Sequence, residues 1–151
     1  MEWELIPARR KSNLIVRARI IQAIRLFFSE RTFLEVETPI RIPAPAPEMH
    51  IDAIPADGWF LQTSPELCMK RMLAAGYGKI FQLSKCFRHH ERGRWHLPEF
   101  TMLEWYQTDA SYHDLMAHCE HLFEFIQTAL PALPKDNGIR YKNHLIDITL
   151  P

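Results

Sequence analysis

The chain has 151 residues, 47% of them hydrophobic and 24% charged, so it is long enough to bury the core of one globular domain. Lys plus Arg and Asp plus Glu each number 18, and a net charge of zero argues against a protein that coats nucleic acid. Three widely spaced cysteines, no apolar run of membrane-spanning length and an acidic start (Glu2, Glu4) favour a cytoplasmic protein over a secreted or membrane protein.

The first elements are expected to be a helix and a strand. Ser12 is a suitable N-cap for a helix over 13–30, where apolar residues recur at helical spacing. Alternation over 33–38 then predicts a half-buried strand, with Leu34 and Val36 on its buried side.

A proline-rich segment and a second helix follow. Four prolines within 42–58 favour a partly extended loop, and 59–62 is a short strand candidate. Ser-Pro-Glu at 64–66 is a helix start, because it combines a capping side chain, a proline in the first turn and a carboxylate near the positive helix end. This helix is expected to end at Gly76 or Gly78.

The second half predicts two long strands and a third helix. Alternation marks strands over 80–88 and 100–106, with a charged loop between them. Asp109 or Ser111 then caps a helix that runs to about residue 130, and 139–150 is expected to form two short strands. The order of elements predicts an α+β fold with a mostly antiparallel sheet flanked by helices. The core-facing stripe of the last helix is expected to contain Leu115, Cys119, Leu122 and Ile126.

One group of side chains in this hairpin suggests a binding site. Arg88 ends the first strand, and Phe100, Glu104 and Tyr106 alternate along one face of the second. An arginine fork suits a phosphate, a phenylalanine face suits a base, and Glu104 with Tyr106 suits an ammonium group, to which Glu66 could add a carboxylate. Taken alone, the pattern is more often a cross-strand ion pair on a solvated face beside two core aromatics.

Several short sequence pieces, taken in order, favour the binding site over the structural ion pair. Residues 80–106 resemble motif 2 of the class II aminoacyl-tRNA synthetases in its lysyl form, and residues 20–39 resemble motif 1, which forms that family's dimer interface. The resemblance covers about residues 12–151. The matching pieces are Thr63-Ser64-Pro65-Glu66-Leu67, Met69-Lys70-Arg71, Phe81-Gln82-Leu83, Cys86-Phe87-Arg88 and the run from Pro98 to Tyr106.

Within that family the pieces resemble the stand-alone paralogue of lysyl-tRNA synthetase that modifies elongation factor P with β-lysine. We expect this subtype because the chain begins directly at the catalytic domain, without room for an anticodon-binding domain ahead of residues 20–39. The resemblance implies ATP and Mg²⁺, a homodimer built through the motif 1 region, and lysine or β-lysine as substrate. The acceptor would be a lysine of elongation factor P, or tRNA in the alternative of a lysyl-tRNA synthetase.

The resemblance also implies a role for individual residues. Arg88 would hold the α-phosphate of ATP during attack by the substrate carboxylate, and His96 would lie near the outer phosphates. Phe100 would stack on adenine, while backbone groups near His89 and His90 read its edge. The product would be an aminoacyl-adenylate. Four residues would hold the two amino groups of a lysine-like substrate: Ser64, Glu66, Glu104 and Tyr106.

The sequence departs from the family in three places. The family's Arg-x-Glu has His90 at the glutamate position, so Glu91 is expected to take its place near ATP. Leu97 stands where the family has an asparagine. Arg140 is the only arginine in the last third of the chain, so we expect motif 3 and the Mg²⁺ ligands downstream, a chain that stops within its domain, and no normal adenylate formation by the chain alone.

Three other readings compete with this one. A zinc site in the charged loop fits no standard ligand spacing. Nucleic-acid binding through the basic run at 9–11 is weakened by the zero net charge. A non-catalytic half-domain that binds a partner stays open. The loop residues behind the zinc reading are Cys86, His89, His90 and His96.

Overall fold

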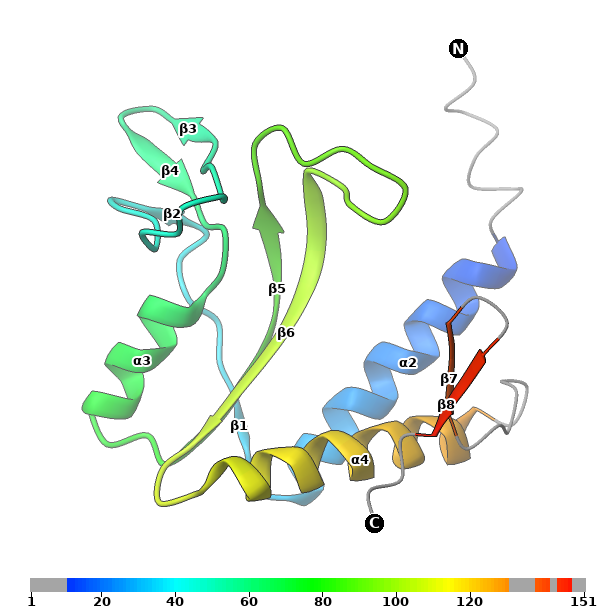
Figure 1. Cartoon of the computed structure of the whole chain (residues 1–151). Coiled ribbons are helices and arrows are strands. Elements are labelled where there is room, and N and C mark those ends of the chain that lie inside the picture. The colour runs from blue at the N-terminus through cyan, green and yellow to red at the C-terminus, as the bar shows by residue number, and fades with distance from the viewer. Residues whose placement is uncertain (1–10, 131–137, 142–143, 148–151) are drawn as a thin grey trace. The chain divides into compact units, whose positions relative to one another are not determined.

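The computed structural model describes residues 11–130, 138–141 and 144–147 (Figure 1). The chain divides into two compact units, one formed by Thr32–Asp109 and the other by the described parts of Met1–Arg31 and Ala110–Pro151. Each unit has its own elements and its own buried side chains. Among the described residues, none of the helices is both long enough and apolar enough to cross a bilayer.

The unit Thr32–Asp109 is built on a three-stranded sheet in the order β1 (Leu34–Glu35), β5 (Lys79–Phe87), β6 (Glu99–Gln107). The long strands β5 and β6 are antiparallel and form the hairpin at the centre of Figure 1, whereas β1 pairs parallel to the start of β5. Both long strands lie where alternation predicted them. Four of the five strand pairs in the described residues are antiparallel, which confirms a mixed α and β chain with small sheets.

A second small sheet corrects the prediction of a loop over 42–58. Its order is β2 (Arg41–Ile42), β4 (Trp59–Leu61), β3 (Pro55–Ala56), with all pairs antiparallel. Strand β3 pairs only with β4, and a proline is tolerated at such an edge because no ladder hydrogen bond needs its missing N–H. Two-residue strands are too short to produce a detectable alternation.

Helix α3 (Glu66–Ala74) ends where the sequence predicted, but its N-cap is Pro65 rather than the predicted Ser64. The Glu66 N–H donates to Ser64 Oγ at 3.0 Å, so the serine satisfies one of the free amides of the first turn. At the other end Gly76 has φ +96° and donates its N–H to the Leu73 carbonyl at 2.9 Å. A left-handed residue is the usual stop signal, and glycine adopts it without strain.

The predicted burial of the first strand is wrong. Strand β1 has two residues rather than six, and Leu34 is 52% exposed. Phe33 takes the buried position instead, with the Lys79 ammonium 5.5 Å from its ring centre. A strand this short does not present a continuous face, so alternation assigned Leu34 to the wrong side.

In the other unit, α2 (Lys11–Glu30) packs against α4 (Tyr112–Ala129). The rings of Phe27 and Phe125 meet edge to face with centroids 5.7 Å apart. The prediction that Ser12 caps the first helix is wrong, because Lys11 before it is already helical. The buried contributions come from Ala23, Ile24, Phe27, Phe28 and Leu122.

The start of α4 is confirmed at Ser111. Its hydroxyl accepts from the Asp114 N–H, and the Asp114 carboxylate accepts from the Ser111 N–H at 2.7 Å, which is a reciprocal capping box. Leu115 is an error in the predicted stripe, since it is 47% exposed one turn into the helix. The predicted pair of short strands is present as the antiparallel hairpin β7 (Gly138–Tyr141) and β8 (His144–Asp147).

Candidate functional site

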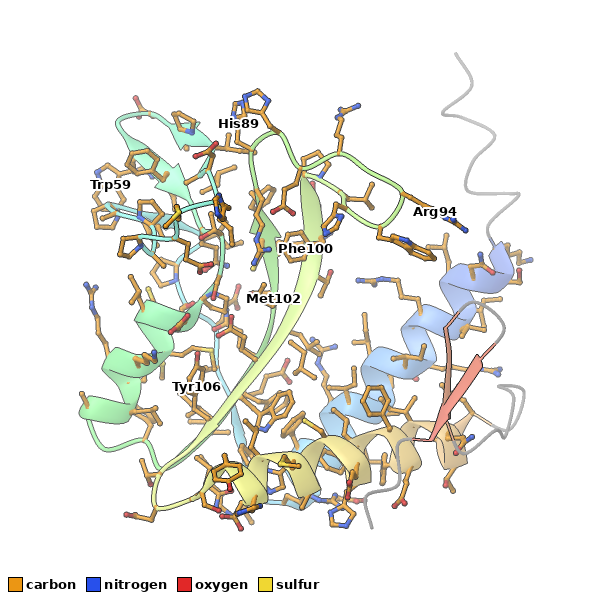
Figure 2. The ribbon with its side chains drawn as sticks, viewed as in Figure 1. Trp59, His89, Arg94, Phe100, Met102 and Tyr106 are labelled. Carbon is orange, nitrogen blue, oxygen red and sulfur yellow. The ribbon has the colours of Figure 1, made fainter. Side chains whose placement is uncertain are left out.

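All the site residues predicted from the sequence lie in the unit Thr32–Asp109. Strand β6 carries three of them on one face: Phe100, Glu104 and Tyr106. Figure 2 shows how this face runs along the strand from Phe100 past Met102 to Tyr106. The register of the hairpin sets Gln82 opposite Glu104 and Cys86 opposite Phe100. Residues directly opposite in an antiparallel pair share a face, so the two strands build one surface.

The carboxylate of Glu104 is held by two hydroxyl groups. The Ser64 hydroxyl donates to Oε1, and the Tyr106 hydroxyl donates to Oε2 at 2.9 Å. Both donors are neutral, so they fix the orientation of the carboxylate without cancelling its charge. Each oxygen keeps a further lone pair, which leaves the group able to accept from an ammonium.

The same network keeps Tyr106 protonated. Burial raises the pKa of the Tyr106 phenol well above its ordinary value, and the hydrogen bond to Glu104 and the negative charges of Glu104 and Glu66 raise it further. A phenolate beside these carboxylates would bring like charges together. Tyr106 is therefore a hydrogen-bond donor over the whole physiological pH range.

Glu66 forms an ion pair within its own helix. Its carboxylate pairs with the Lys70 ammonium, one turn later on α3. The two side chains are 35% and 56% exposed, so water screens the pair and the contact is weak. Ser64 still links this helix to the network, because its hydroxyl accepts from the Glu66 N–H while donating to Glu104. A role for Glu66 in binding a substrate ammonium remains a prediction.

Arg88 and Phe100 lie together at the other end of the surface. The guanidinium carbon of Arg88 is 5.1 Å from the Phe100 ring centre, within the range of a cation–π contact. The Arg88 Nε donates to the Thr63 carbonyl at 3.5 Å, and Nη1 lies 3.7 Å from Glu91 Oε1. These contacts orient the planar fork, and most of its donors remain available for a phosphate.

Thr63 and Ser64 connect the two ends. These neighbours in the chain contact Arg88 and Glu104 respectively. The segment that carries them leaves β4 and enters α3 directly, so the fold delivers one short stretch to both ends of the hairpin face.

The loop between β5 and β6 carries the predicted histidines, which have fewer side-chain contacts with the site than Arg88 and Glu104 have. The His89 N–H donates to the Asp52 carbonyl at 2.7 Å, and its ring meets that of His90 with centroids 3.7 Å apart. His90 has φ +61°, a left-handed conformation that histidine adopts more readily than most residues. His96 is exposed, and its carbonyl accepts from the Gly93 N–H at 3.2 Å. The structure brings Glu91 to Arg88 but gives the His96 side chain no contact there within the described residues.

The zinc alternative receives no support from the described residues. Cys86 is fully buried on β5, and burial raises the pKa of its thiol. Over residues 11–130 and the two described strands after them, no three His, Cys, Asp or Glu side chains gather where they could hold a metal ion.

Sequence reasoning missed two buried hydrogen bonds beside the site, made by Thr38 and Gln62. The Thr38 hydroxyl donates to Gln82 Oε1 at 3.1 Å, and Gln62 Nε2 donates to the Lys85 carbonyl at 2.9 Å. Both glutamines are almost wholly buried. Alternation placed Gln82 on the site face, but only the small sheet that begins at Arg41 explains why Thr38 and Gln62 lie beside β5.

Comparisons with known proteins agree with one another. A family model described as tRNA synthetases class II (D, K and N) matches residues 4–148. A protein of Vibrio parahaemolyticus named elongation factor P–(R)-β-lysine ligase is 43% identical over 134 residues, which cover 82% of this chain and 41% of the relative. Proteins with the same name from Haemophilus influenzae and Histophilus somni are 43% identical over 140 residues and 41% identical over 154 aligned residues.

These two matches cover 86% and 95% of this chain, but 43% and 47% of the relatives. The chain therefore spans less than half the length of the curated relatives that it matches.

Proposed function

The chain belongs to the class II tRNA synthetase family, and from this premise we propose that its full-length protein is an ATP-dependent aminoacyl ligase. The proposed reaction activates lysine or β-lysine as an aminoacyl-adenylate and transfers it to a lysine of elongation factor P. The names of the relatives support this acceptor, since they describe ligases of elongation factor P and (R)-β-lysine.

One observation supports the proposal most strongly: an oriented carboxylate and an oriented guanidinium share one face of the β5–β6 hairpin. Glu104, held by Ser64 and Tyr106, suits an amino group of the substrate. Arg88, placed on Phe100, suits a phosphate of ATP with the base nearby. An amino acid carboxylate lying between the two would be close to the α-phosphorus, which is the geometry that adenylate formation needs.

In the first step the substrate carboxylate attacks the α-phosphorus of ATP, the new acyl–phosphate bond forms, and pyrophosphate leaves. Negative charge grows on the phosphoryl oxygens in the transition state, and the fixed guanidinium of Arg88 stabilises it. In the second step an acceptor amine attacks the acyl carbon, an amide bond forms and AMP leaves.

The family also implies Mg²⁺ alongside ATP, where the ion would neutralise phosphate charge. The described residues contain no group of three side chains suited to hold it. The steps above therefore use only the side chains of this chain.

The test is an acceptor comparison with the full-length protein. It is given ATP, radiolabelled (R)-β-lysine or lysine, and either elongation factor P or lysine tRNA. We expect label on elongation factor P and pyrophosphate exchange that depends on the amino acid. Label on tRNA alone would support the lysyl-tRNA synthetase alternative, and an absence of exchange with either amino acid would contradict adenylate formation.

A further inference from the structure

We propose that Gln62 is a positioning residue that fixes the separation between the phosphate end and the ammonium end of the site. The proposal rests on the function proposed above, because a separation matters only when two substrates must react with each other. Gln62 lies immediately before Thr63 and Ser64, the two residues that contact Arg88 and Glu104.

Gln62 is bonded on both sides of the segment that carries it. Its N–H donates to the Ile40 carbonyl at 2.8 Å, and its carbonyl accepts from the Phe87 N–H at 2.9 Å. Its side-chain Nε2 donates to the Lys85 carbonyl at 2.9 Å. One residue thus occupies two backbone groups of β5, as a paired strand would.

These bonds lie on the edge of β5 that β1 leaves uncovered. Strand β1 pairs with β5 at Ile80 and Phe81, and the Val36 N–H extends this pairing with a bond to the Phe81 carbonyl. The later part of the same edge meets Gln62 at Lys85 and Phe87. Arg88 follows Phe87 directly, so Gln62 is hydrogen-bonded to β5 next to the residue proposed to bind phosphate.

Because Gln62 directly precedes Thr63 and Ser64, its position affects both the Arg88 end and the Glu104 end of the site. Successive Cα atoms of a trans chain lie about 3.8 Å apart, so a shift of Gln62 moves Thr63 and Ser64 with it. The Thr63 carbonyl would then shift against Arg88, and the Ser64 hydroxyl would shift against Glu104.

Stability alone does not favour a glutamine at this place. Gln62 is fully buried, and within the described residues its Oε1 has no hydrogen-bond partner. A buried acceptor without a partner is unfavourable, and this opposes the gain from the Nε2 bond. Methionine has a similar shape without either polar atom, so Gln62→Met removes an unfavourable and a favourable contribution together.

The test compares Gln62→Met with Gln107→Met in the full-length protein. Gln107 is a matched control: its Oε1 is also buried without a partner among the described residues, and it lies at the far end of β6 on the face opposite Tyr106. Melting temperature is measured first, followed by kcat and KM for ATP and for the amino acid in pyrophosphate exchange.

Gln62→Met keeps both backbone bonds of residue 62 and loses only the Nε2 bond to the Lys85 carbonyl. We therefore expect a melting temperature within about 3 °C of the wild type and a kcat about 3- to 10-fold lower. Both KM values should stay within about threefold, because each end still binds its own substrate and only their relative placement has changed. Gln107→Met should keep kcat within about twofold.

A folded Gln62→Met protein with wild-type kcat would overturn the proposal. If Gln62→Met does not fold, Gln62→Asn replaces it, since the shorter amide stays polar but no longer reaches Lys85. Failure of both variants to fold would assign Gln62 to stability and would also overturn the proposal. Absence of exchange in the wild-type protein would instead mean that the proposed function itself is wrong.

Discussion

At the scale of single residues, the structure distinguishes the carboxylate that we expect to bind the substrate from the hydroxyl groups that orient this carboxylate. Glu104 carries the charge, while Ser64 and Tyr106 hold its two oxygens in place. Alternation pointed to Glu104 and Tyr106, and the resemblance added Ser64 to the residues expected to hold the substrate. Its hydroxyl is bonded on both sides, to Glu104 and to the Glu66 N–H, so its main effect is on orientation.

Glu104→Gln should therefore affect one substrate and not the other. The amide cannot attract an ammonium by charge, so we expect KM for the amino acid to rise by about 10- to 100-fold with KM for ATP little changed. Glu99→Gln is the matched control, because Glu99 lies on the same strand in an exposed pair with Lys85. Equal effects of the two substitutions on amino acid KM would show that Glu104 is not the ammonium site.

Tyr106 gives a prediction about alkaline pH. Because burial and the neighbouring carboxylates raise the pKa of its phenol in the folded protein, the unfolded chain loses this proton first as pH rises. The contribution of Tyr106 to the free energy of unfolding is complete below about pH 10 and falls above it.

We expect urea unfolding between pH 9 and 11 to show a steeper loss of stability for the wild type than for Tyr106→Phe. Tyr77→Phe is the control, because Tyr77 is 43% exposed on the turn after α3. A Tyr106→Phe protein with the same pH dependence as the wild type would contradict the prediction that the Tyr106 phenol causes the loss of stability above about pH 10.

At the scale of elements, the sequence predicted the long elements and the short strands β4, β7 and β8, but it missed β2 and β3. Strands β5 and β6 have nine residues each, which gives alternation room to show. Strands β2 and β3 have two residues each, and tertiary pairing rather than local pattern creates them. The pairs Arg88–Phe100 and Glu104–Tyr106 could be predicted because they lie on the long strands or directly after one. The positions of Gln62 and Thr38 could not, because they depend on the short ones.

The capping box of α4 should contribute measurably to stability. Ser111→Ala removes the hydroxyl that accepts from the Asp114 N–H, and we expect the free energy of unfolding to fall by about 1 kcal/mol. Ser29→Ala is a suitable control, since the Ser29 hydroxyl only donates to the Leu26 carbonyl within α2. Chemical denaturation of both variants measures the difference, and equal values would mean that the cap contributes nothing.

At the scale of the whole molecule, the chain consists of two units, and the candidate site belongs to one of them. Composition and charge predicted a globular chain that does not coat nucleic acid, and they say nothing about assembly. The homodimer implied by the resemblance of residues 20–39 remains a proposal. In this stretch Leu26 and Leu34, which belong to different units, are each about half exposed, and each is available to a partner chain.

A charge at these positions should weaken the dimer. We expect Leu26→Glu to lower the dimer fraction in light scattering over a dilution series, because an interface core does not accommodate an unpaired carboxylate. Met49→Glu is the control, since Met49 is 89% exposed and lies outside residues 20–39. A wild-type protein that is monomeric at every concentration would remove the proposal.

The measurement that tests the central claim most directly is the binding of a non-hydrolysable lysyl-adenylate analogue to the full-length protein. Such a molecule carries an amino group, a phosphate-like group and adenine together. We predict one analogue per chain by calorimetry, with affinity lowered about 10- to 100-fold in Arg88→Ala and in Glu104→Gln. No binding by the wild type, or wild-type affinity in both variants, would contradict a site with the ammonium at Glu104 and the phosphate at Arg88.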